Sequence, residues 1–300
     1  MTFTLAACGG QQGSAGEGLS GSVKIDGSST VEPLSSAANE LYSQQQPGIE
    51  VTVAASGTSG GFEAFCAGRT DISDASRPIE PDEAKACKQN GIEYTRLQVA
   101  NDAITVAAHK SVPVDCLTVE QLNKIWAPES QGKITNWKQV DPSFPDMPLK
   151  LFGPGTDSGT FDYFTEEING EEGASRADYE ASEDDNVLVQ GVANTPGALG
   201  YFGYTYYEEN AGKLKAIEVD SGDGCVAPSP QTAQSGEYDP LARPLYIYVS
   251  DQSYAQKPQV AGFVDFYIEN VSRITEAAKY IQMSPEQQQQ TQKALQTLSG

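Results

Sequence analysis

The sequence predicts an α/β fold with two domains and mainly parallel sheets. Its 300 residues are about twice the length of a common domain, and 38% hydrophobic residues supply enough apolar material for two cores. Stretches patterned as strands alternate with stretches patterned as helices, which favours parallel strands. In sheets of that kind, ligands bind at the carboxyl ends of the strands.

Three segments share one order of strand, polar turn and helix. Each strand is short and apolar, each turn is rich in Ser, Thr and Gly, and a helical pattern follows. The three are strand 23–25 with helix 31–45, strand 49–55 with helix 62–67, and strand 149–152 with helix 161–168. Hydroxyl-rich turns therefore follow the carboxyl ends of three strands.

The remaining elements complete the α/β pattern. We expect further strands at 102–108, 198–203 and 244–249, and further helices at 118–126, 204–210 and 260–271. Thr118 caps the first of these helices, and Ser284 with Pro285 opens a last polar helix. The acidic segment 170–185 is predicted to be a solvated loop or a short helix, and 220–239 a surface excursion.

Composition excludes several classes of function. The chain has 19 Lys and Arg against 41 Asp and Glu, a net charge of −22, so it lacks the positive charge of a nucleic-acid or anionic-membrane binder. No stretch approaches the ~18 consecutive apolar residues that span a bilayer. The single histidine, His109, argues against histidine-rich metal sites and leaves a hydrolytic triad one imidazole. We expect neither metal nor cofactor.

The first residues resemble a lipoprotein processing site. The segment Leu5-Ala6-Ala7-Cys8 has the pattern of a bacterial lipobox, at which a signal peptide is cut and the new terminal Cys is acylated. The residues after it, rich in Gly, Ser and Gln, are typical of a flexible tether. We therefore expect 1–21 to be a signal remnant and tether, with a lipid on Cys8.

Four further cysteines suit two disulfides in an oxidising compartment. Cys66, Cys87, Cys116 and Cys225 allow three pairings, and four free thiols are the alternative. We favour Cys66–Cys87 and Cys116–Cys225 because each pair then lies within one domain. The absence of any Cys-x-x-Cys spacing makes a zinc site the weakest interpretation.

The three hydroxyl-rich turns have the chemistry of an oxyanion site. A helix amino terminus presents unpaired N–H groups and the positive end of the helix dipole, and hydroxyl groups add neutral donors. The hydroxyl donors are Ser29, Thr30, Ser56, Ser59, Ser158 and Thr160. A single such residue is more often a plain N-cap, so the hypothesis depends on the threefold occurrence. Arg77 adds a guanidinium that suits an oxyanion, the alternative being a surface salt bridge.

These turns also resemble those of a known family. The segments 26–30, 55–61, 71–78 and 156–161 together resemble the periplasmic phosphate-binding proteins of bacterial Pst ABC uptake systems. The stretch 196–201, Pro-Gly-Ala-Leu-Gly-Tyr, is similar to a late Pro-Gly-Ala-Ile-Gly-Tyr stretch of that family. The resemblance implies two α/β lobes joined by a hinge of two crossing strands, with phosphate in the cleft between them.

The resemblance assigns phosphate contacts to individual residues. They are Ser29, Thr30, Ser59, Ser158, Gly159 and Thr160, with Ser28 and Ser56 as weaker candidates. One branch of the family has an Arg before the third turn, where this chain has Gly153-Pro154-Gly155. Arg77 resembles the substitute in branches with an Ala-Ser-Arg segment. Ser76 stands where the family has an Asp that contacts the ligand, and we count Ser76 and Arg77 among the expected phosphate contacts.

A carboxylate acceptor would explain selectivity for phosphate. A buried carboxylate accepts a hydrogen bond only from a ligand that still has a proton, as phosphate does at neutral pH and sulfate does not. The candidates are Asp102, at a strand start near a hinge crossing, then Asp74 and Asp157. Our hypothesis is that Asp102 or Asp74 is this acceptor.

Two other kinds of function stay open. The stretch 57–61 fits the G-x-S-x-G pattern of serine hydrolases, with Ser59 as nucleophile and His109 as the one available base. This is the weakest alternative, because His109 ends an apolar strand where exposure to solvent is the simpler explanation. A binding protein for another tetrahedral oxyanion, or a phosphate sensor, would share the same scaffold.

The combined prediction is an extracytoplasmic phosphate-binding protein that performs no chemistry. It is a monomer, contacts the membrane only through a lipid anchor, binds no nucleic acid, and delivers inorganic phosphate to the permease of an ABC transporter. One lobe comprises residues 22–101 and 242–300, and the other comprises 102–241.

Overall fold

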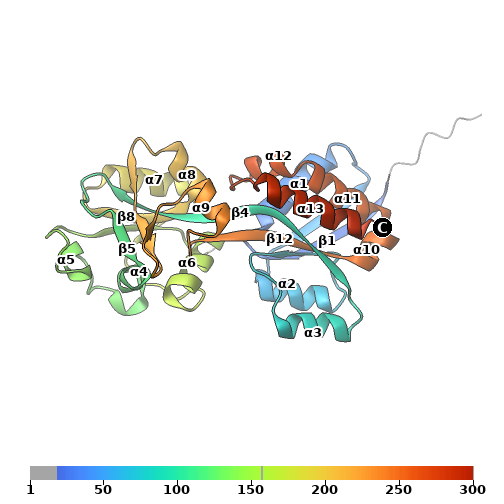
Figure 1. Cartoon of the computed structure of the whole chain (residues 1–300), viewed down its shortest axis with the longest axis horizontal. Coiled ribbons are helices and arrows are strands. Elements are labelled where there is room, and N and C mark those ends of the chain that lie inside the picture. Colours follow the sequence, from blue (N-terminus) through green and yellow to red (C-terminus); the bar gives the residue numbers. More distant parts are fainter. Residues whose placement is uncertain (1–18, 157, 300) are drawn as a thin grey trace, which may run out of the picture.

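The computed structural model describes residues 19–156 and 158–299. The predicted lipid site at Cys8, most of the tether and the candidate acceptor Asp157 lie outside the described residues. Helices and strands gather in two lobes, which β4 (Tyr94–His109) and β12 (Ala242–Ser250) connect (Figure 1). The predicted two-lobed α/β fold with two crossing strands is confirmed. Among the helices of the described chain, none has both the length and the apolar character of a membrane span.

The first lobe is built on a sheet with the strand order β2-β1-β3-β12-β4. β1 (Gly21–Gly27) runs parallel to β2 (Ile49–Ala54) and β3 (Ile72–Ala75), since helices connect these strands. One face is covered by α1 (Glu32–Ser43), α11 (Pro258–Glu269), α12 (Val271–Ala277) and α13 (Pro285–Leu298), and the other by α2 (Gly57–Cys66) and α3 (Pro81–Gln89) (Figure 1). Core residues of both faces come from 23–100 and 245–283.

The second lobe continues the same sheet beyond β4. The strands that follow are β8 (Ala198–Gly203), β6 (Lys150–Gly153) and β7 (Glu180–Ala181), with β9 (Leu214–Ala216) also paired to β4. The sheet lies between α4 (Val119–Trp126) and α6 (Gly159–Asn169) on one side and α7 (Asp185–Asn194) and α8 (Tyr204–Glu209) on the other (Figure 1). Its core residues come from 103–241, together with Ile281.

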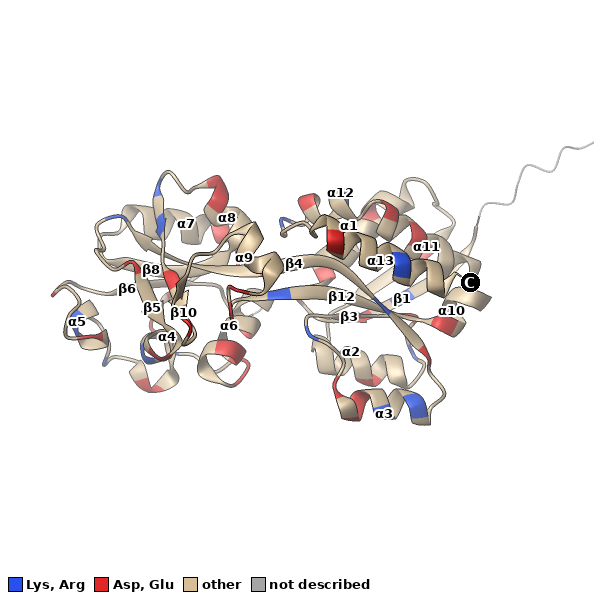
Figure 2. Cartoon of the chain, viewed as in Figure 1, with Lys and Arg blue, Asp and Glu red and all other residues tan. Residues whose placement is uncertain are grey.

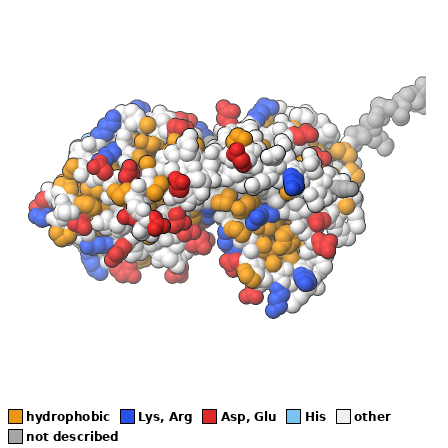
Figure 3. All heavy atoms as spheres, viewed as in Figure 1, with side chains coloured by type: hydrophobic (Ala, Val, Ile, Leu, Met, Phe, Trp, Pro, Cys, Tyr) orange, Lys and Arg blue, Asp and Glu red, His pale blue; other side chains and the backbone are white. Residues whose placement is uncertain are grey.

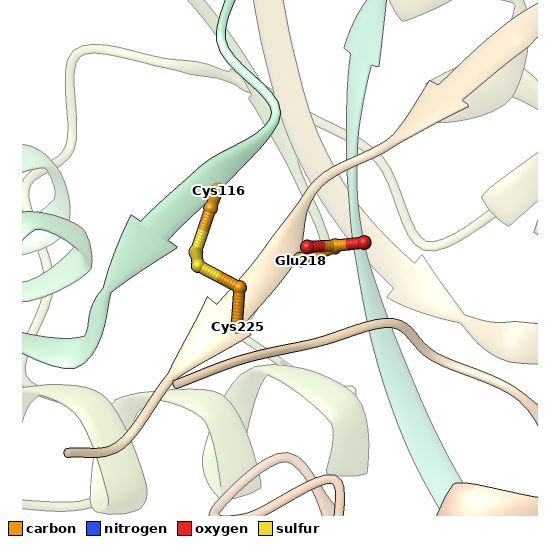
Figure 4. A group of neighbouring side chains, drawn as sticks. All are labelled: Cys116, Glu218 and Cys225. Carbon is orange, nitrogen blue, oxygen red and sulfur yellow. A yellow bond between two sulfur atoms is a disulfide. The ribbon is translucent and has the colours of Figure 1, made fainter. Parts of the chain in front are cut away.

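A small three-stranded sheet in the second lobe contains one of the disulfides. β10 (Glu218–Asp220) lies between β5 (Cys116–Thr118) and β11 (Cys225–Val226), and the Cys116–Cys225 bond joins the outer strands (Figure 4). Cys66–Cys87 joins α2 to α3, so both predicted disulfides are present. Within the described chain, Glu218 and these two cysteines form the one group of three possible metal ligands. The disulfide consumes both thiols, which leaves a single carboxylate and no metal site.

The sheets are mixed, and the expectation of mainly parallel strands is wrong in this respect. β12 runs antiparallel to β3 and β4, and β4 runs antiparallel to β8 and β9. The reason is that β4 takes the chain into the second lobe and β12 brings it back, so the two strands point in opposite directions. β4 exchanges β12 for β8 between Ala103 and Ile104, and an irregularity at Leu245/Tyr246 interrupts the β4–β12 pairing nearby.

Local signals place the helix starts well. Thr118 Oγ1 accepts a hydrogen bond from Gln121 N at the start of α4, and Ser284 Oγ accepts one from Gln287 N at the start of α13. The predicted surface excursion at 220–239 proves to include β11 and α9 (Pro230–Ser235). The short helices α5 (Trp137–Val140) and α10 (Asp251–Gln256) complete the fold.

Candidate functional site

Three helices begin at one place between the lobes. α1 and α2 follow strands of the first lobe and α6 follows β6 of the second, each after one of the predicted hydroxyl-rich turns. Thr30 Oγ1 donates a hydrogen bond to Gly159 O at 3.3 Å. A Cβ on Gly159 would lie 2.8 Å from Thr30 N, so only glycine fits this contact. The first and third turns therefore meet across the cleft.

A cavity of about 350 Å³ opens beside this meeting point. A water molecule occupies about 30 Å³ in the liquid, so the cavity has room for a small oxyanion and several waters. Its lining includes seven of the side chains singled out from the sequence, which are Ser28, Ser29, Thr30, Ser56, Ser59, Ser76 and Arg77. The first and second turns thus open into one space, and the molecule narrows there between its two lobes (Figure 3).

The third turn contributes differently. Ser158 caps α6 by accepting a hydrogen bond from Thr160 N at 3.2 Å, just as Ser28 accepts one from Thr30 N in the first turn. Thr160 lines a second cavity of about 210 Å³, whereas Gly159 touches the first turn. A hydroxyl group that accepts a hydrogen bond still has its own hydrogen to donate. The third turn therefore lies at the boundary between the two cavities.

Arg77 lines the first cavity but is paired. Its Nη1 and Nη2 donate to the two carboxylate oxygens of Glu83 at 2.9 and 2.8 Å, and its Nε lies 3.5 Å from Glu80. Nη2 also donates to Ser59 Oγ at 2.8 Å. Arg77 therefore forms a surface salt bridge and also lines the candidate site.

A second arginine that no sequence motif indicated, Arg243 at the start of β12, also lines this cavity. Its Nη2 donates to Thr30 Oγ1 at 2.9 Å, and its Cζ lies 3.4 Å from the ring centroid of Tyr163. The side chain is 13% exposed, and its Nε lies 3.7 Å from Asp102 Oδ2. The one sequence feature that could have indicated Arg243 is its charge, placed directly before the apolar strand predicted at 244–249.

The second lobe gives the cavity an acidic side, and Figure 2 shows acidic residues along and after α6. The acids that line it are Asp162, Glu166, Glu167, Glu172 and Asp239. Ser29 Oγ donates to Asp162 Oδ2 at 3.3 Å, and burial, followed by the charge of Glu172, raises the pKa of Asp162. Donors of the first lobe thus face acceptors of the second.

The two described candidates for the acceptor carboxylate do not line this cavity. Asp74 is fully buried below the first turn, where its Oδ1 accepts from Ser35 Oγ at 2.9 Å and burial raises its pKa to about 8. Asp102 lines the second cavity, next to Arg243, and burial raises its pKa. Asp162 is instead the carboxylate that both lines the cavity and accepts a hydrogen bond from the first turn.

The hydrolase alternative needs Ser59 beside His109. Ser59 is in the first turn of α2, in the first lobe, and accepts a hydrogen bond from Arg77. His109 ends β4 in the second lobe, where its Nδ1 lies 2.7 Å from Ser111 Oγ. No other histidine exists in the chain, so Ser59 has no imidazole to accept its proton.

Comparisons with known proteins identify the family of this chain. A family model described as a PBP superfamily domain matches residues 12–271. The chain is 50% identical over 260 residues to SphX of Synechococcus elongatus, which covers 86% of this chain and 77% of that protein. It is 38% identical over 302 residues to the phosphate-binding protein PstS of Staphylococcus saprophyticus, covering 100% and 92%. The crystal structure of a possible phosphate binding protein from Planctomyces limnophilus matches with a TM-score of 0.90 at 46% identity, covering 94% of this chain and 100% of that one.

Proposed function

Because the chain belongs to the PBP superfamily, and within it to the family of SphX and PstS, we propose that it binds inorganic phosphate between its lobes and delivers it to the permease of an ABC transporter. The observation that supports this best is the convergence of three hydroxyl-rich helix starts, from both lobes, on one place. Helix N–H groups and hydroxyls bind an oxyanion without needing a positive surface. The protein then acts by binding and release and performs no chemistry.

The proposed contacts follow the three turns. Ser29 and Thr30 of the first turn and Ser59 and Ser76 beside the second face the cavity, with Ser28 and Ser56 next to them. The start of α6 adds the backbone N–H groups and hydroxyls of Ser158, Gly159 and Thr160, of which Gly159 adjoins the first turn. Arg77 forms the outer wall with Ser59. A ligand held by both sides would draw the lobes together.

Selectivity against sulfate requires a carboxylate in contact with the ligand. Asp162 fits this role better than Asp102 or Asp74, because it lines the cavity and already accepts a hydrogen bond from the first turn. Hydrogen phosphate can donate its proton to Asp162, whereas sulfate would place two acceptors face to face. We therefore assign the acceptor role to Asp162.

Replacing Asp162 with asparagine is expected to reduce the ratio of phosphate to sulfate affinity at least tenfold, since a hydrogen bond to a charged group contributes about 1.5–3 kcal/mol. The asparagine amide can donate to sulfate but cannot accept as strongly from phosphate. Titration calorimetry with each anion at pH 8 measures the ratio. Asp102→Asn and Asp74→Asn serve as matched variants. An unchanged ratio in Asp162→Asn with a reduced one in either of the others would move the role to that residue.

The function itself is tested by calorimetry on the wild-type protein. Bound ligand is first removed by partial unfolding, and the refolded protein is titrated with phosphate and with sulfate at pH 8. One-to-one binding of phosphate without binding of sulfate supports the proposal. Binding of sulfate alone would indicate a carrier of another oxyanion, and binding of neither would refute the function.

We also propose where the protein works and how its lobes divide. Cys8 would anchor an extracytoplasmic monomer through a lipid, and Cys8→Ser in cells should then release the protein from the membrane fraction. The lobes would be 22–101 with 242–300, and 102–241. The exchange of partners by β4 between Ala103 and Ile104 supports these bounds.

A further inference from the structure

We infer that Arg243 supplies the positive charge that contacts the bound anion, and that through it the anion is linked to both lobes. Arg77 and Arg243 are the only cationic side chains among the described residues that line the 350 Å³ cavity. The inference rests on the proposed function, because it identifies the charged partner of the same ligand. It assigns the role to a residue that no sequence motif indicated.

Arg77 is poorly placed for this task. Both of its terminal nitrogens are held by the Glu83 carboxylate, and Glu80 lies beside its Nε. A bidentate arginine–carboxylate pair is among the strongest side-chain interactions, and its guanidinium charge is already compensated. An anion would have to displace Glu83 before it could use both arms of this guanidinium.

Arg243 has the opposite arrangement. Its Nη2 donates to the neutral hydroxyl of Thr30, and its face is packed on the Tyr163 ring. The carboxylate of Asp102 comes within 3.7 Å of Nε, which is beyond hydrogen-bond distance, and this buried Nε has no hydrogen-bond partner within the described chain. The guanidinium is therefore fixed in place and partly desolvated, and it lacks the bidentate carboxylate that holds Arg77.

The location of Arg243 brings it to the ligand. Thr30 lies in the first turn, which lines the cavity, so an anion bound at this turn lies next to Arg243 Nη2, which is 2.9 Å from Thr30 Oγ1. Tyr163 belongs to α6 of the second lobe, and Arg243 itself begins a crossing strand. One side chain thus contacts the first lobe, the second lobe and the hinge. An anion that bridges the first turn and Arg243 would favour the arrangement in which the two lobes and the hinge are together.

Asp102 keeps this arginine in position. It pairs with Arg243 directly across the β4–β12 ladder, and it lines the second cavity but not the first. The carboxylate compensates part of the buried charge and leaves the face toward Thr30 to the ligand. Asp102 is a positioning residue in this arrangement, and it does not contact the anion.

The test compares arginine variants of the full chain by calorimetric titration with inorganic phosphate at pH 8. Arg243→Met is expected to weaken binding about a hundredfold or more, as truncation of one partner of a buried charged pair does. Arg243→Lys restores the positive charge without the two terminal nitrogens of a guanidinium, and it should recover part of the lost affinity. Arg77→Met should cost about tenfold or less, since its guanidinium is already paired. Arg96→Met is the matched control, because Arg96 also stacks on a tyrosine, Tyr246, but does not line the cavity.

A second variant separates binding from folding. Arg243→Met leaves Asp102 buried without its partner, whereas the double variant Arg243→Met with Asp102→Asn leaves the hinge neutral. Circular dichroism melting checks that the double variant is folded. The folded double variant should lose as much phosphate affinity as Arg243→Met does. The inference would be overturned if the double variant bound phosphate within threefold of wild type. It would also be overturned if Arg77→Met lost more phosphate affinity than Arg243→Met. Either result would leave the proposed function intact. A wild-type protein that binds no phosphate would overturn both.

Discussion

Replacing Cys116 and Cys225 together with alanine is expected to lower the free energy of unfolding by about 4–5 kcal/mol. The two residues are 109 positions apart, so the bond closes a loop that includes most of the second lobe. Chain-entropy estimates assign about 4.7 kcal/mol to a cross-link that closes about 100 residues. The effect arises in the unfolded chain, which gains freedom when the bond is absent.

Denaturant unfolding under oxidising conditions measures this loss. Cys225→Ala alone breaks the same bond at an exposed position, and it should give the same loss as the double variant. Neither cysteine lines the 350 Å³ cavity, so phosphate affinity should stay within about twofold of wild type at low denaturant. A loss of stability below about 1 kcal/mol would show that the cross-link does not constrain the unfolded lobe as the loop length predicts.

The sequence was sufficient for the features that depend on local pattern. A Ser/Thr/Gly turn between a strand and a helix specifies a helix start, and parallel strands bring successive helix starts to one edge of a sheet. The first and second turns therefore meet at the cavity as predicted. The cysteine pairing was predictable as well, because each pair needed only to stay within one lobe.

The charged partners were harder to predict because register and strand direction determine them. Arg243 meets Asp102 only through the antiparallel pairing of β12 with β4, and it meets Thr30 across 213 positions of sequence. No short motif records either relation. The partners of Arg77, by contrast, could be predicted from nearby sequence. Glu80 and Glu83 lie three and six residues after Arg77 and form the capping box of α3.

The acidic segment 170–185 also contains a residue, Arg176, whose contacts the local sequence pattern did not predict. It was expected to be a solvated loop or a short helix, yet it contains Arg176, whose side chain is 2% exposed. Arg176 Nη1 donates to the carbonyl oxygens of Ile125 and Ile134 at 3.0 and 2.9 Å. Its Nε and Nη2 donate to the two oxygens of Asp178 at 2.6 and 2.8 Å. The side chain thus ties the end of α4 and the following loop to this segment.

Replacing Arg176 with methionine is expected to lower the free energy of unfolding by about 2–5 kcal/mol, because this buried guanidinium is the donor to two main-chain carbonyl groups and each buried acceptor left without a partner costs about 1–3 kcal/mol. The carbonyl groups of Ile125 and Ile134 would lose the Arg176 donor, whereas Asp178 would still accept from Gly132 N. Thermal or denaturant unfolding at pH 7 measures the change. A loss below about 1 kcal/mol would mean that water replaces the guanidinium at this site.

The partner of Arg176 adds a pH dependence whose sign is determined. The hydrogen bonds from Arg176 lower the pKa of Asp178 from its usual 3.8 to about 2. A carboxyl group whose pKa is lowered by folding stabilises the folded state fully above its unfolded pKa, and this contribution is lost as the pH falls from about 4 towards 2. Asp178→Asn should therefore be less stable than wild type at pH 7 and should lose less stability between pH 4 and pH 2. Asp146→Asn is the matched control, since Asp146 is exposed and lies 4.0 Å from Lys138 at the surface. If the wild type and Asp178→Asn lost stability in parallel below pH 4, other carboxylates would determine the acid unfolding of this lobe.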